Sequence, residues 1–388
     1  MKLTKNIEFK NFKLKNSKKK IQRLFIKLIN ENNYILKSLN KSYKDSFNKT
    51  DIAKFKKYTN IVIIGIGGSI LGAKTIYTFL KKKIKKKIFF IDDFKSEKLI
   101  NISNKKKLNV IVSKSGNTLE TIANSNILIA KKDQNIFITE KKKSYLRSLA
   151  NELKCNIIDH NNYIGGRYSV LSEVGMVPAE LMGLNAKKFR VYNQLVKNKN
   201  FINALVNNVS NILTLVNKNK SNSIIINYDQ QSADLFYWYQ QLVAESLGKK
   251  GMGILPIISN MPKDNHSLMQ LYLDGKKNNF YTFFFVKEKF SKKIANEKIL
   301  NSHSYLKGKS LSDIMYSQHN ATQKVFNKKN IPFRSFFIND RNEKSLGELF
   351  SFFILETILL GKALNLNPYD QPAVELIKIN TKKILKNS

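Results

Sequence analysis

Cysteine is almost absent from this sequence: Cys155 is the single one in 388 residues. One thiol excludes an internal disulfide and a metal cluster built on cysteines, and it fits a reducing compartment. Long apolar runs are absent too, because the most apolar segment, 350–360, carries Glu356 and falls short of the roughly 20 residues that span a bilayer. The first residues are charged and lack the apolar core of a secretory signal. We therefore expect a soluble cytoplasmic protein that is not embedded in a membrane.

Acidic residues and arginine are also scarce. The chain has 28 Asp and Glu against 68 Lys and Arg, a formal net charge of +40, and only six of the basic residues are Arg. Such a charge invites a nucleic-acid-binding interpretation, but recognition of bases and phosphates relies on the planar fork of Arg. Because the Lys residues are spread along the whole chain, we interpret them as a solvated surface that attracts anionic substrates and has no specific nucleic-acid partner. Binding of a polyanion remains the alternative.

Short apolar runs and amphipathic stretches alternate from residue 60 onward. Strands that are apolar on both faces and separated by helices are typical of a parallel sheet covered on both sides. The runs predict strands at 61–64, 87–91, 109–112, 135–139 and 156–159, then at 223–227, within 251–262, at 280–286 and at 332–338. The sequence therefore predicts an α/β fold with two doubly wound parallel sheets and flanking helices.

The chain length and the two cycles of strands also predict a division into domains. We expect a helical N-terminal extension over 1–50, a first sheet domain over 51–190 and a second over 191–370. A last helix within 371–388 is expected to pack back on the body.

Two loops that follow predicted strands are suited to hold a phosphate. Segment 65–69 has three glycines before a helix, which lets a ligand approach the backbone and the free N–H groups of the helix start. Segment 113–121 places four hydroxyl groups before another helix. Taken alone, tight packing explains the first loop, and a capping box with Glu120 explains the second equally well. Two such loops in one open sheet favour phosphate binding, because ligands bind beyond the carboxyl ends of the strands.

Four polar residues further along suggest chemistry. Two glycines precede Arg167 and can aim its permanent cation inward, although a surface Arg on a turn is the alternative. Glu245 lies near the end of a predicted helix, where it could act as a base or simply pair with Lys249 one turn later. His266 at a helix start and Lys378 on an amphipathic helix are, by themselves, consistent with ordinary structural positions.

Taken in order, six segments between about residues 55 and 380 resemble the phosphoglucose isomerase family. They are Gly-Ile-Gly-Gly-Ser at 65–69, Ser-Lys-Ser-Gly-Asn-Thr-Leu-Glu-Thr at 113–121, Gly-Gly-Arg-Tyr-Ser at 165–169, Glu-Ser-Leu-Gly-Lys at 245–249, the segment around His266, and Tyr-Asp-Gln-Pro-Ala-Val-Glu-Leu-Ile-Lys at 369–378. The resemblance implies two sugar-isomerase domains, a homodimer, and reversible isomerisation of glucose 6-phosphate to fructose 6-phosphate through a cis-enediolate in glycolysis and gluconeogenesis. It implies no metal or redox cofactor.

The resemblance also implies a role for each matching residue. Glu245 corresponds to the base that moves a proton between C2 and C1, and Arg167 to the cation that stabilises the enediolate. His266, contributed by the neighbouring subunit, and Lys378 correspond to the pair that opens the sugar ring. The residues at substrate-contacting positions are Gly68, Ser69, Ser113, Lys114, Ser115, Thr118 and Thr121 around the phosphate, with Gln241 and Gln371 near the sugar. Aldose–ketose chemistry needs such a carboxylate and such a fixed cation.

Three residues depart from the family pattern. Asn117 stands where Thr is commoner, Glu173 where a small residue is usual, and Ala373 where Gly is usual. They bear on affinity and sugar choice more than on the reaction, and Glu173 would offset the charge of Arg167 if it pointed inward. A bifunctional phosphoglucose/phosphomannose isomerase and a non-catalytic sugar-phosphate-binding protein with the same fold remain the alternatives.

Overall fold

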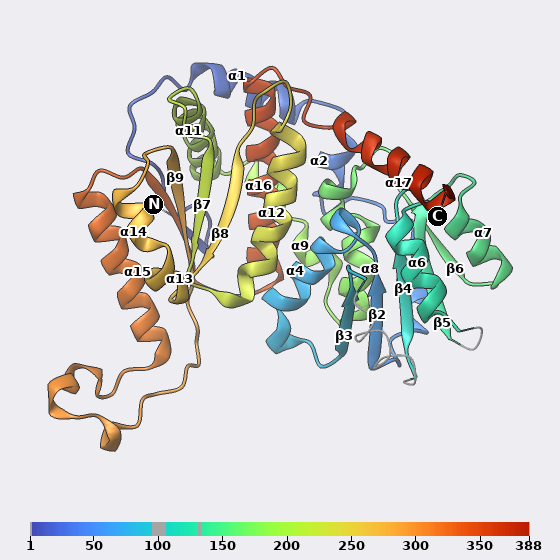
Figure 1. Ribbon diagram of the computed structural model, residues 1–388, viewed down its shortest axis with the longest axis horizontal. Helices are drawn as coiled ribbons and strands as arrows, with labels where there is room; N and C mark the ends of the chain where they lie inside the picture. Colours follow the sequence, from blue (N-terminus) through green and yellow to red (C-terminus); the bar gives the residue numbers. More distant parts are fainter. Residues whose placement is uncertain (1, 95–105, 131–132, 388) are drawn as a thin grey trace.

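Two five-stranded sheets organise the chain in the computed structural model, which describes residues 2–94, 106–130 and 133–387 (Figure 1). The first sheet is parallel, in the order β3-β2-β4-β5-β6. The second has the order β1-β10-β9-β7-β8, with β1 antiparallel at one edge and the other four parallel. The strands are β1 (Ile7–Lys10), β2 (Asn60–Ile64), β3 (Lys87–Ile91), β4 (Leu108–Val112), β5 (Gln134–Glu140), β6 (Asn156–His160), β7 (Asn222–Asn227), β8 (Leu255–Asn260), β9 (Asn279–Val286) and β10 (Phe333–Ile338). The predicted fold class is confirmed, and each predicted strand is present.

Helices cover both faces of each sheet, as Figure 1 shows. They are α1 (Lys19–Ile29), α2 (Tyr34–Ser38), α3 (Lys49–Ala53), α4 (Leu71–Phe79), α6 (Leu119–Leu128), α7 (Tyr145–Glu152), α8 (Glu173–Leu181), α9 (Ala186–Phe189), α10 (Tyr192–Leu195), α11 (Lys199–Val216), α12 (Ala233–Leu247), α13 (Lys263–Ser267), α14 (Met269–Asp274), α15 (Leu311–Lys328), α16 (Glu343–Ala363) and α17 (Glu375–Asn387). Among these helices, none combines the length and the apolar character needed to cross a bilayer.

Alternate residues of the central strands enter different cores. Ile61 and Ile63 of β2 belong to the core that includes α4 and α8, whereas Val62 and Ile64 belong to the core that includes α6 and α7. In the second sheet, neighbouring residues of β9 divide in the same way between the side of α12 and α16 and the side of α14 and α15. This explains the uninterrupted apolar runs in the sequence, because both faces of a parallel sheet are buried.

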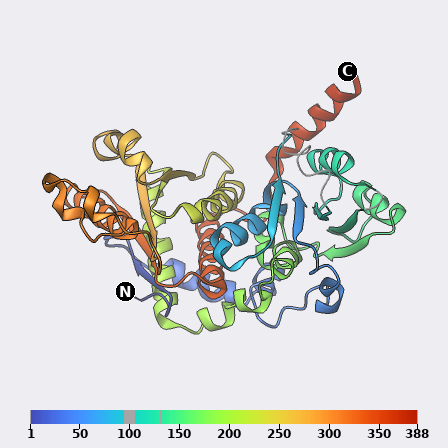
Figure 2. The same cartoon turned by 90° about the horizontal axis from the view of Figure 1, so that it is seen from below.

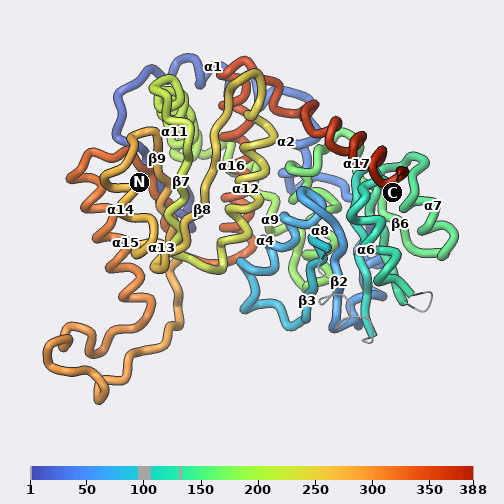
Figure 3. The backbone as a smooth tube through the Cα atoms, in the orientation of Figure 1, coloured from blue at the N-terminus to red at the C-terminus, as the bar shows by residue number. Residues whose placement is uncertain are grey.

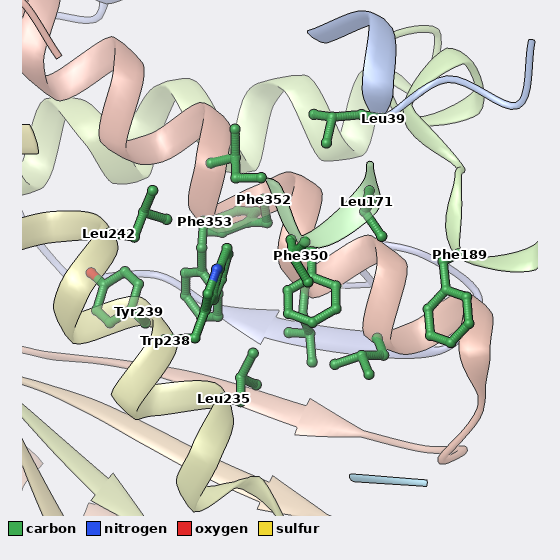
Figure 4. Close-up of a cluster of buried hydrophobic side chains, with 14 of the residues drawn as sticks. Leu39, Leu171, Phe189, Leu235, Trp238, Tyr239, Leu242, Phe350, Phe352 and Phe353 are labelled. Carbon is green, nitrogen blue, oxygen red and sulfur yellow. The ribbon is translucent and has the colours of Figure 1, made fainter. Parts of the chain in front are cut away.

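Helices α12 and α16 lie between the two sheets and carry much of the largest core (Figure 4). The indole of Trp238 on α12 packs edge-on against the ring of Phe350 on α16, with ring centroids 4.8 Å apart. Trp238 Nε1 also donates a hydrogen bond to the carbonyl oxygen of Arg167 at 3.1 Å. On α4, Thr75 Oγ1 donates to the carbonyl oxygen of Asp234 at 2.9 Å. The start and middle of α12 are thereby fixed against α4 and the segment that carries Arg167.

Two segments extend from this body. Residues 287–310, between β9 and α15, form the long excursion at the lower left of Figure 3, where Phe290 is 88% exposed. Helix α17 projects away from the body in Figure 2, and none of its described residues is buried. We expected this last helix to pack back on the body. The helix is present, but in the single chain its apolar side chains, such as Ile377, remain exposed. The predicted domain boundaries at residues 50, 190 and 370 stay a prediction.

Candidate active site

The loops that follow β2 and β6 are in backbone contact. Gly68 lies in the short 3₁₀ helix η1 (Gly67–Ser69), and Gly166 begins a second one, η3 (Gly166–Leu171). A Cβ on Gly68 would lie 2.2 Å from the carbonyl carbon of Gly166 and 2.6 Å from the amide nitrogen of Arg167. Glycine is required here because any side chain would force the two loops apart. The contact places Gly68 and its neighbour Ser69 beside the residue that carries the predicted catalytic cation.

The loop after β4 lies next to the loop after β2. Strand β2 pairs with β3 on one side and with β4 on the other, so the strand order reverses between β2 and β4. A Cβ on Gly65 would lie 3.0 Å from the carbonyl oxygen of Val112, the last residue of β4. Open α/β sheets bind their ligands at such a reversal. Both predicted phosphate loops are therefore at the expected place.

Two hydroxyl groups of segment 113–121 meet at the start of α6. The hydroxyls of Ser113 and Thr118 are hydrogen-bonded at 2.8 Å, and Ser113 Oγ accepts from the Gly116 amide at 3.2 Å. Thr121 Oγ1 is buried and has no hydrogen-bond partner among the residues described. Thr118 occupies the N-cap position, yet its side chain makes no capping hydrogen bond. A capping role does not account for the Thr118 hydroxyl, and the start of a helix is a place where an oxyanion can bind.

Lys114 and Ser115 lie on the outer part of the same loop. Lys114 Nζ donates to the carbonyl oxygen of Asn162 at 2.8 Å and lies 3.4 Å from Glu140 Oε1. Ser115 Oγ accepts from the Asn117 amide at 3.2 Å. Asn117, one of the three departures from the family pattern, also accepts a hydrogen bond from the first residue of α7 at 2.9 Å. Asn117 thus ties the loop to α7.

Arg167 is buried, with 2% of its surface exposed, and all five of its N–H groups have acceptors. Nε donates to Ser246 Oγ at 2.8 Å. Nη2 donates to the carbonyl oxygens of Pro368 at 2.8 Å and Asp370 at 3.0 Å. These three bonds hold one edge of the guanidinium against α12 and segment 368–370. The alternative of a surface Arg is wrong.

The other edge of Arg167 meets two predicted site residues. Nη1 lies 3.2 Å from Glu245 Oε2 and 2.7 Å from Gln371 Oε1. Gln241 Nε2, one turn earlier on α12, donates to the other oxygen of Glu245 at 2.7 Å. The Glu245 side chain is 28% exposed, so the carboxylate is fixed on both oxygens and still open to solvent. The structure therefore brings Arg167, Glu245, Gln241 and Gln371 together.

Lys249 does not pair with Glu245. Its Nζ contacts Asp370 Oδ1 at 2.5 Å and also the carbonyl oxygen of Asn367. The hydrogen bond from Lys249 is the main reason that the pKa of Asp370 is lowered. This ion pair fixes the segment whose carbonyl groups hold Arg167.

Tyr168 and Ser246 are supports that sequence reasoning missed. Burial raises the pKa of Tyr168, more than the neighbouring Arg167 lowers it, so the phenol stays neutral. Its hydroxyl bonds Ser246 Oγ at 2.9 Å and donates to the carbonyl oxygen of Pro368 at 2.9 Å. Both residues lie within the quoted motifs, but their contacts join segments about 80 and 200 residues apart, which no local pattern reveals.

A groove of about 550 Å³ opens beside Glu245, between α4 and α12. Gly67, Gln241 and Glu245 line one part of it, and Lys74 and Asp234 line another. A small polar ligand can reach the Glu245 carboxylate through this groove. Within the described ranges, no set of three or more His, Cys, Asp or Glu side chains is placed to hold a metal ion.

His266 and Lys378 are not part of this cluster in the single chain. His266 is exposed on α13, and its imidazole makes no hydrogen bond with any residue of the described ranges. Lys378 Nζ, on the projecting α17, bonds only Glu375 Oε2 at 3.2 Å among the described residues, with both side chains 64% exposed. Ala373 is exposed just before the same helix. Glu173 does not point at Arg167, because its carboxylate bonds Tyr43 instead.

Comparisons with known proteins show which proteins the chain resembles. The family model described as phosphoglucose isomerase matches residues 29–388. The chain is 33% identical over 353 residues to a glucose-6-phosphate isomerase of Methanocaldococcus jannaschii, with 86% of each chain covered. It is similar in fold to a hypothetical protein of Thermus thermophilus (TM-score 0.83, 23% identity, 95% and 94% of the chains covered). It is also similar in fold to a glucose-6-phosphate isomerase of Chlamydia trachomatis (TM-score 0.71, 20% identity, 87% and 72% covered).

Proposed function

The chain belongs to the phosphoglucose isomerase family and interconverts glucose 6-phosphate and fructose 6-phosphate, and we propose that Glu245 is the base that moves the proton in this reaction. The observation that carries the proposal is the contact of the Glu245 carboxylate with the buried Arg167 guanidinium, at 3.2 Å, beside an open groove. A fixed carboxylate next to a fixed cation is what an enediolate mechanism needs, because one removes a proton while the other stabilises the negative charge that forms.

Glu245 abstracts the proton from C2 of the open-chain aldose and returns it to C1. Gln241 holds Oε1 at 2.7 Å, so the carboxylate keeps its orientation while Oε2 accepts the proton. The partial exposure of Glu245 lets the sugar approach this oxygen from the groove. Fixing the reacting groups in this way avoids a large entropic cost in the transition state.

Arg167 stabilises the enediolate through its Nη1 edge. Nε and Nη2 are bonded to Ser246 and to backbone carbonyl oxygens, so that edge is fixed. The partners of Nη1 are the side chains of Glu245 and Gln371. Gln371 is exposed, so a sugar oxygen that displaces its side chain can bind Nη1 while Glu245 stays in place. Loss of one such donor to a developing oxyanion commonly costs about 100- to 1,000-fold in kcat.

Segment 113–121 anchors the phosphate of the sugar. The hydroxyls of Ser113 and Thr118, the unpaired Thr121 hydroxyl and the free amides at the start of α6 offer several donors to one dianion. The loop 65–69 completes the cradle, with Gly68 and Ser69 on its other side. Lys114 and Ser115 contribute at the outer rim, where the positive charge attracts the substrate.

Lys378 and His266 open the sugar ring, and His266 comes from a second copy of the chain. In its own chain His266 is exposed on α13, which suits a residue that serves a neighbour. Gln371 is bonded to Arg167, and Lys378 follows it by seven residues, so α17 can bring Lys378 to the site by turning about segment 371–374. We place this homodimer in the cytoplasm, with the domain division at residues 50, 190 and 370.

Mixing two inactive variants tests the shared site. His266→Ala keeps Glu245, and Glu245→Gln keeps His266, so only a mixed dimer contains one site with both residues. Refolding an equal mixture is expected to restore about a quarter of the wild-type activity if the subunits assort randomly. No recovery in a mixture that sedimentation shows to be dimeric would place His266 outside the neighbour's site.

The activity is tested by measuring fructose 6-phosphate formation from glucose 6-phosphate and, separately, from mannose 6-phosphate. Turnover of glucose 6-phosphate alone supports the proposed function, and turnover of both supports the bifunctional alternative. A folded protein that binds sugar phosphate and converts neither is a non-catalytic member of the fold, which would overturn the proposal.

A further inference from the structure

The segment that carries Arg167 begins and ends at two buried ionisable residues. His160 is the last residue of β6, and Glu173 is the first residue of α8. Their side chains are 1% and 2% exposed, and His160 Nδ1 lies 3.9 Å from Glu173 Oε2. The intervening residues include η3 and the whole Gly-Gly-Arg motif. The two ends of the catalytic segment are therefore adjacent.

The N-terminal extension forms hydrogen bonds at both ends of this segment, near His160 and at Glu173. Glu173 Oε1 accepts hydrogen bonds from the Tyr43 hydroxyl at 2.9 Å and from the Ser46 amide at 3.3 Å. The Ser46 hydroxyl donates to the carbonyl oxygen of Asp159, one residue before His160, at 2.5 Å. Segment 43–46 thus links the end of β6 to the start of α8.

Arg190 fixes the C-terminal end of η3. It bonds the Asp45 carboxylate with both terminal nitrogens, at 2.8 and 2.5 Å, and donates to the carbonyl oxygen of Leu171 from Nε at 3.1 Å and from Nη2 at 2.9 Å. Its guanidinium carbon lies 4.9 Å from the centre of the Tyr43 ring. Leu171 is the last residue of η3, so the same assembly fixes both Glu173 and the helix that carries Arg167.

The side chains of His160 and Glu173 are electrostatically complementary. In the described part of the chain, both ring nitrogens of His160 and Oε2 of Glu173 lack a hydrogen-bond partner. Burial acts to raise the pKa of Glu173, but His160, the backbone and Tyr43 together lower the pKa by more than burial raises it. The carboxylate therefore keeps its charge. A buried carboxylate oxygen without a donor is costly, and His160 is the adjacent group that can supply one.

We propose that His160 and Glu173 form a clasp that positions Arg167 for its role in the enediolate step. Neither residue contacts the predicted substrate groups, so both act through the backbone of η3 and are positioning residues. Glu173 is one of the positions where this chain departs from the family pattern, which makes the clasp a feature of this chain. The inference rests on the proposed role of Arg167.

The test compares Glu173→Gln and His160→Gln with a matched control, Glu180→Gln. Glu180 is a buried carboxylate on the same helix, but it bonds the Ala186 amide at 3.0 Å, at the far end from η3. Misplacing a catalytic group by about 1 Å costs up to roughly 100-fold in rate, so we expect kcat of the clasp variants to fall at least about tenfold. KM for glucose 6-phosphate should change less than about twofold, because the phosphate loop is untouched.

A second readout separates positioning from simple destabilisation. A phosphorylated aldonic acid that mimics the enediolate should bind the clasp variants more weakly in proportion to kcat, whereas inorganic phosphate should bind them as it binds the wild type. Glu180→Gln should lower the melting temperature and leave kcat and both affinities unchanged. The double variant His160→Gln/Glu173→Gln should be no slower than the slower single variant, because the two residues form one unit.

Three outcomes decide the matter. Wild-type kcat and mimic affinity in both clasp variants would overturn the clasp, as would additive losses in the double variant. If Arg167→Lys retained wild-type activity as well, the proposed role of Arg167 would fail, and this failure is distinguishable from a failure of the clasp alone. If Glu173→Gln does not fold, Tyr43→Phe, which removes one hydrogen bond to Glu173, tests the clasp by the same kcat and affinity measurements.

Discussion

Arg167 Nη1 and Glu245 Oε2 lie 3.2 Å apart, although 78 residues separate them in the sequence. The cation is carried by η3 after the first sheet, and the carboxylate by the last turns of α12 from the second. Trp238 on α12 bonds the Arg167 backbone, so the same helix fixes both partners. The contact joins the two halves of the chain at the proposed site of proton transfer.

Replacement of Lys378 is expected to slow ring opening alone. Lys378→Met should reduce turnover of glucose 6-phosphate on the order of 100-fold, the range for loss of a general acid or base. A four-carbon aldose phosphate that cannot form a ring should be isomerised at the wild-type rate. Both rates are measured by coupled assay at saturating substrate.

Lys382→Met provides the matched control, because Lys382 is exposed one turn later on the same helix. It should behave as the wild type on both substrates. Equal losses on the cyclic and the four-carbon substrate in Lys378→Met would contradict a role confined to ring opening.

A side chain at Gly68 is expected to separate the loops that follow β2 and β6. In Gly68→Ala the new Cβ would lie 2.2 Å from the Gly166 carbonyl carbon, so the loop that carries Arg167 has to move. We expect a loss of about 1–3 kcal/mol in the free energy of unfolding, typical of overpacking, together with a large loss of kcat.

Gly165→Ala is the control for this change. Gly165 has φ of −66°, and its new Cβ would meet only Tyr168 Cδ2, at 3.8 Å. Chemical denaturation should give this variant the wild-type stability within about 0.5 kcal/mol. If the two variants were equally stable and active, the close approach of the loops would not matter.

His319 is expected to make the protein less stable in mild acid. Burial lowers its pKa to about 4, and Lys10 adds to this while a bond to Asn320 opposes it. The unfolded chain binds the proton near pH 6.5 and the folded chain only near pH 4, so the stabilisation present above pH 6.5 is lost as the pH falls between these values. The loss amounts to about 3 kcal/mol.

His319→Phe removes this titration and keeps a ring beside Tyr228 and Phe285. The free energy of unfolding, measured by denaturation at about pH 7 and about pH 4.5, should therefore fall less in the variant than in the wild type. An identical fall in both proteins would show that His319 is not the group that responds.

The sheets and the site loops could be predicted from the sequence because local patterns encode them. The apolar runs of β2 and β9 indicate strands buried on both faces, and glycines between a strand and a helix indicate the loops. The helix expected to start near His266 is in fact two short helices, α13 and α14, which are separated at Leu268, where the backbone leaves helical geometry. Such a break depends on local packing that a periodic pattern does not record.

Long-range supports could not be predicted. Nothing near Glu173 in the sequence points to Tyr43, which lies 130 residues away, and the hydrogen bond between them exists because separate elements pack together. The same holds for the Pro368 and Asp370 carbonyl groups that bind Arg167. The family resemblance predicts Arg167 as a site residue, whereas only the fold reveals what keeps it in place.

The role of Glu245 as the proton-transferring base is tested most directly by Glu245→Gln in deuterated water. The wild type is expected to form fructose 6-phosphate from glucose 6-phosphate with solvent deuterium entering at C1. The variant should form fructose 6-phosphate at least about 100-fold more slowly, and deuterium incorporation should slow by the same factor. Its binding of inorganic phosphate, and of the phosphate group of the enediolate mimic, should be unchanged. Isomerisation and deuterium incorporation at the wild-type rate in Glu245→Gln would contradict the account.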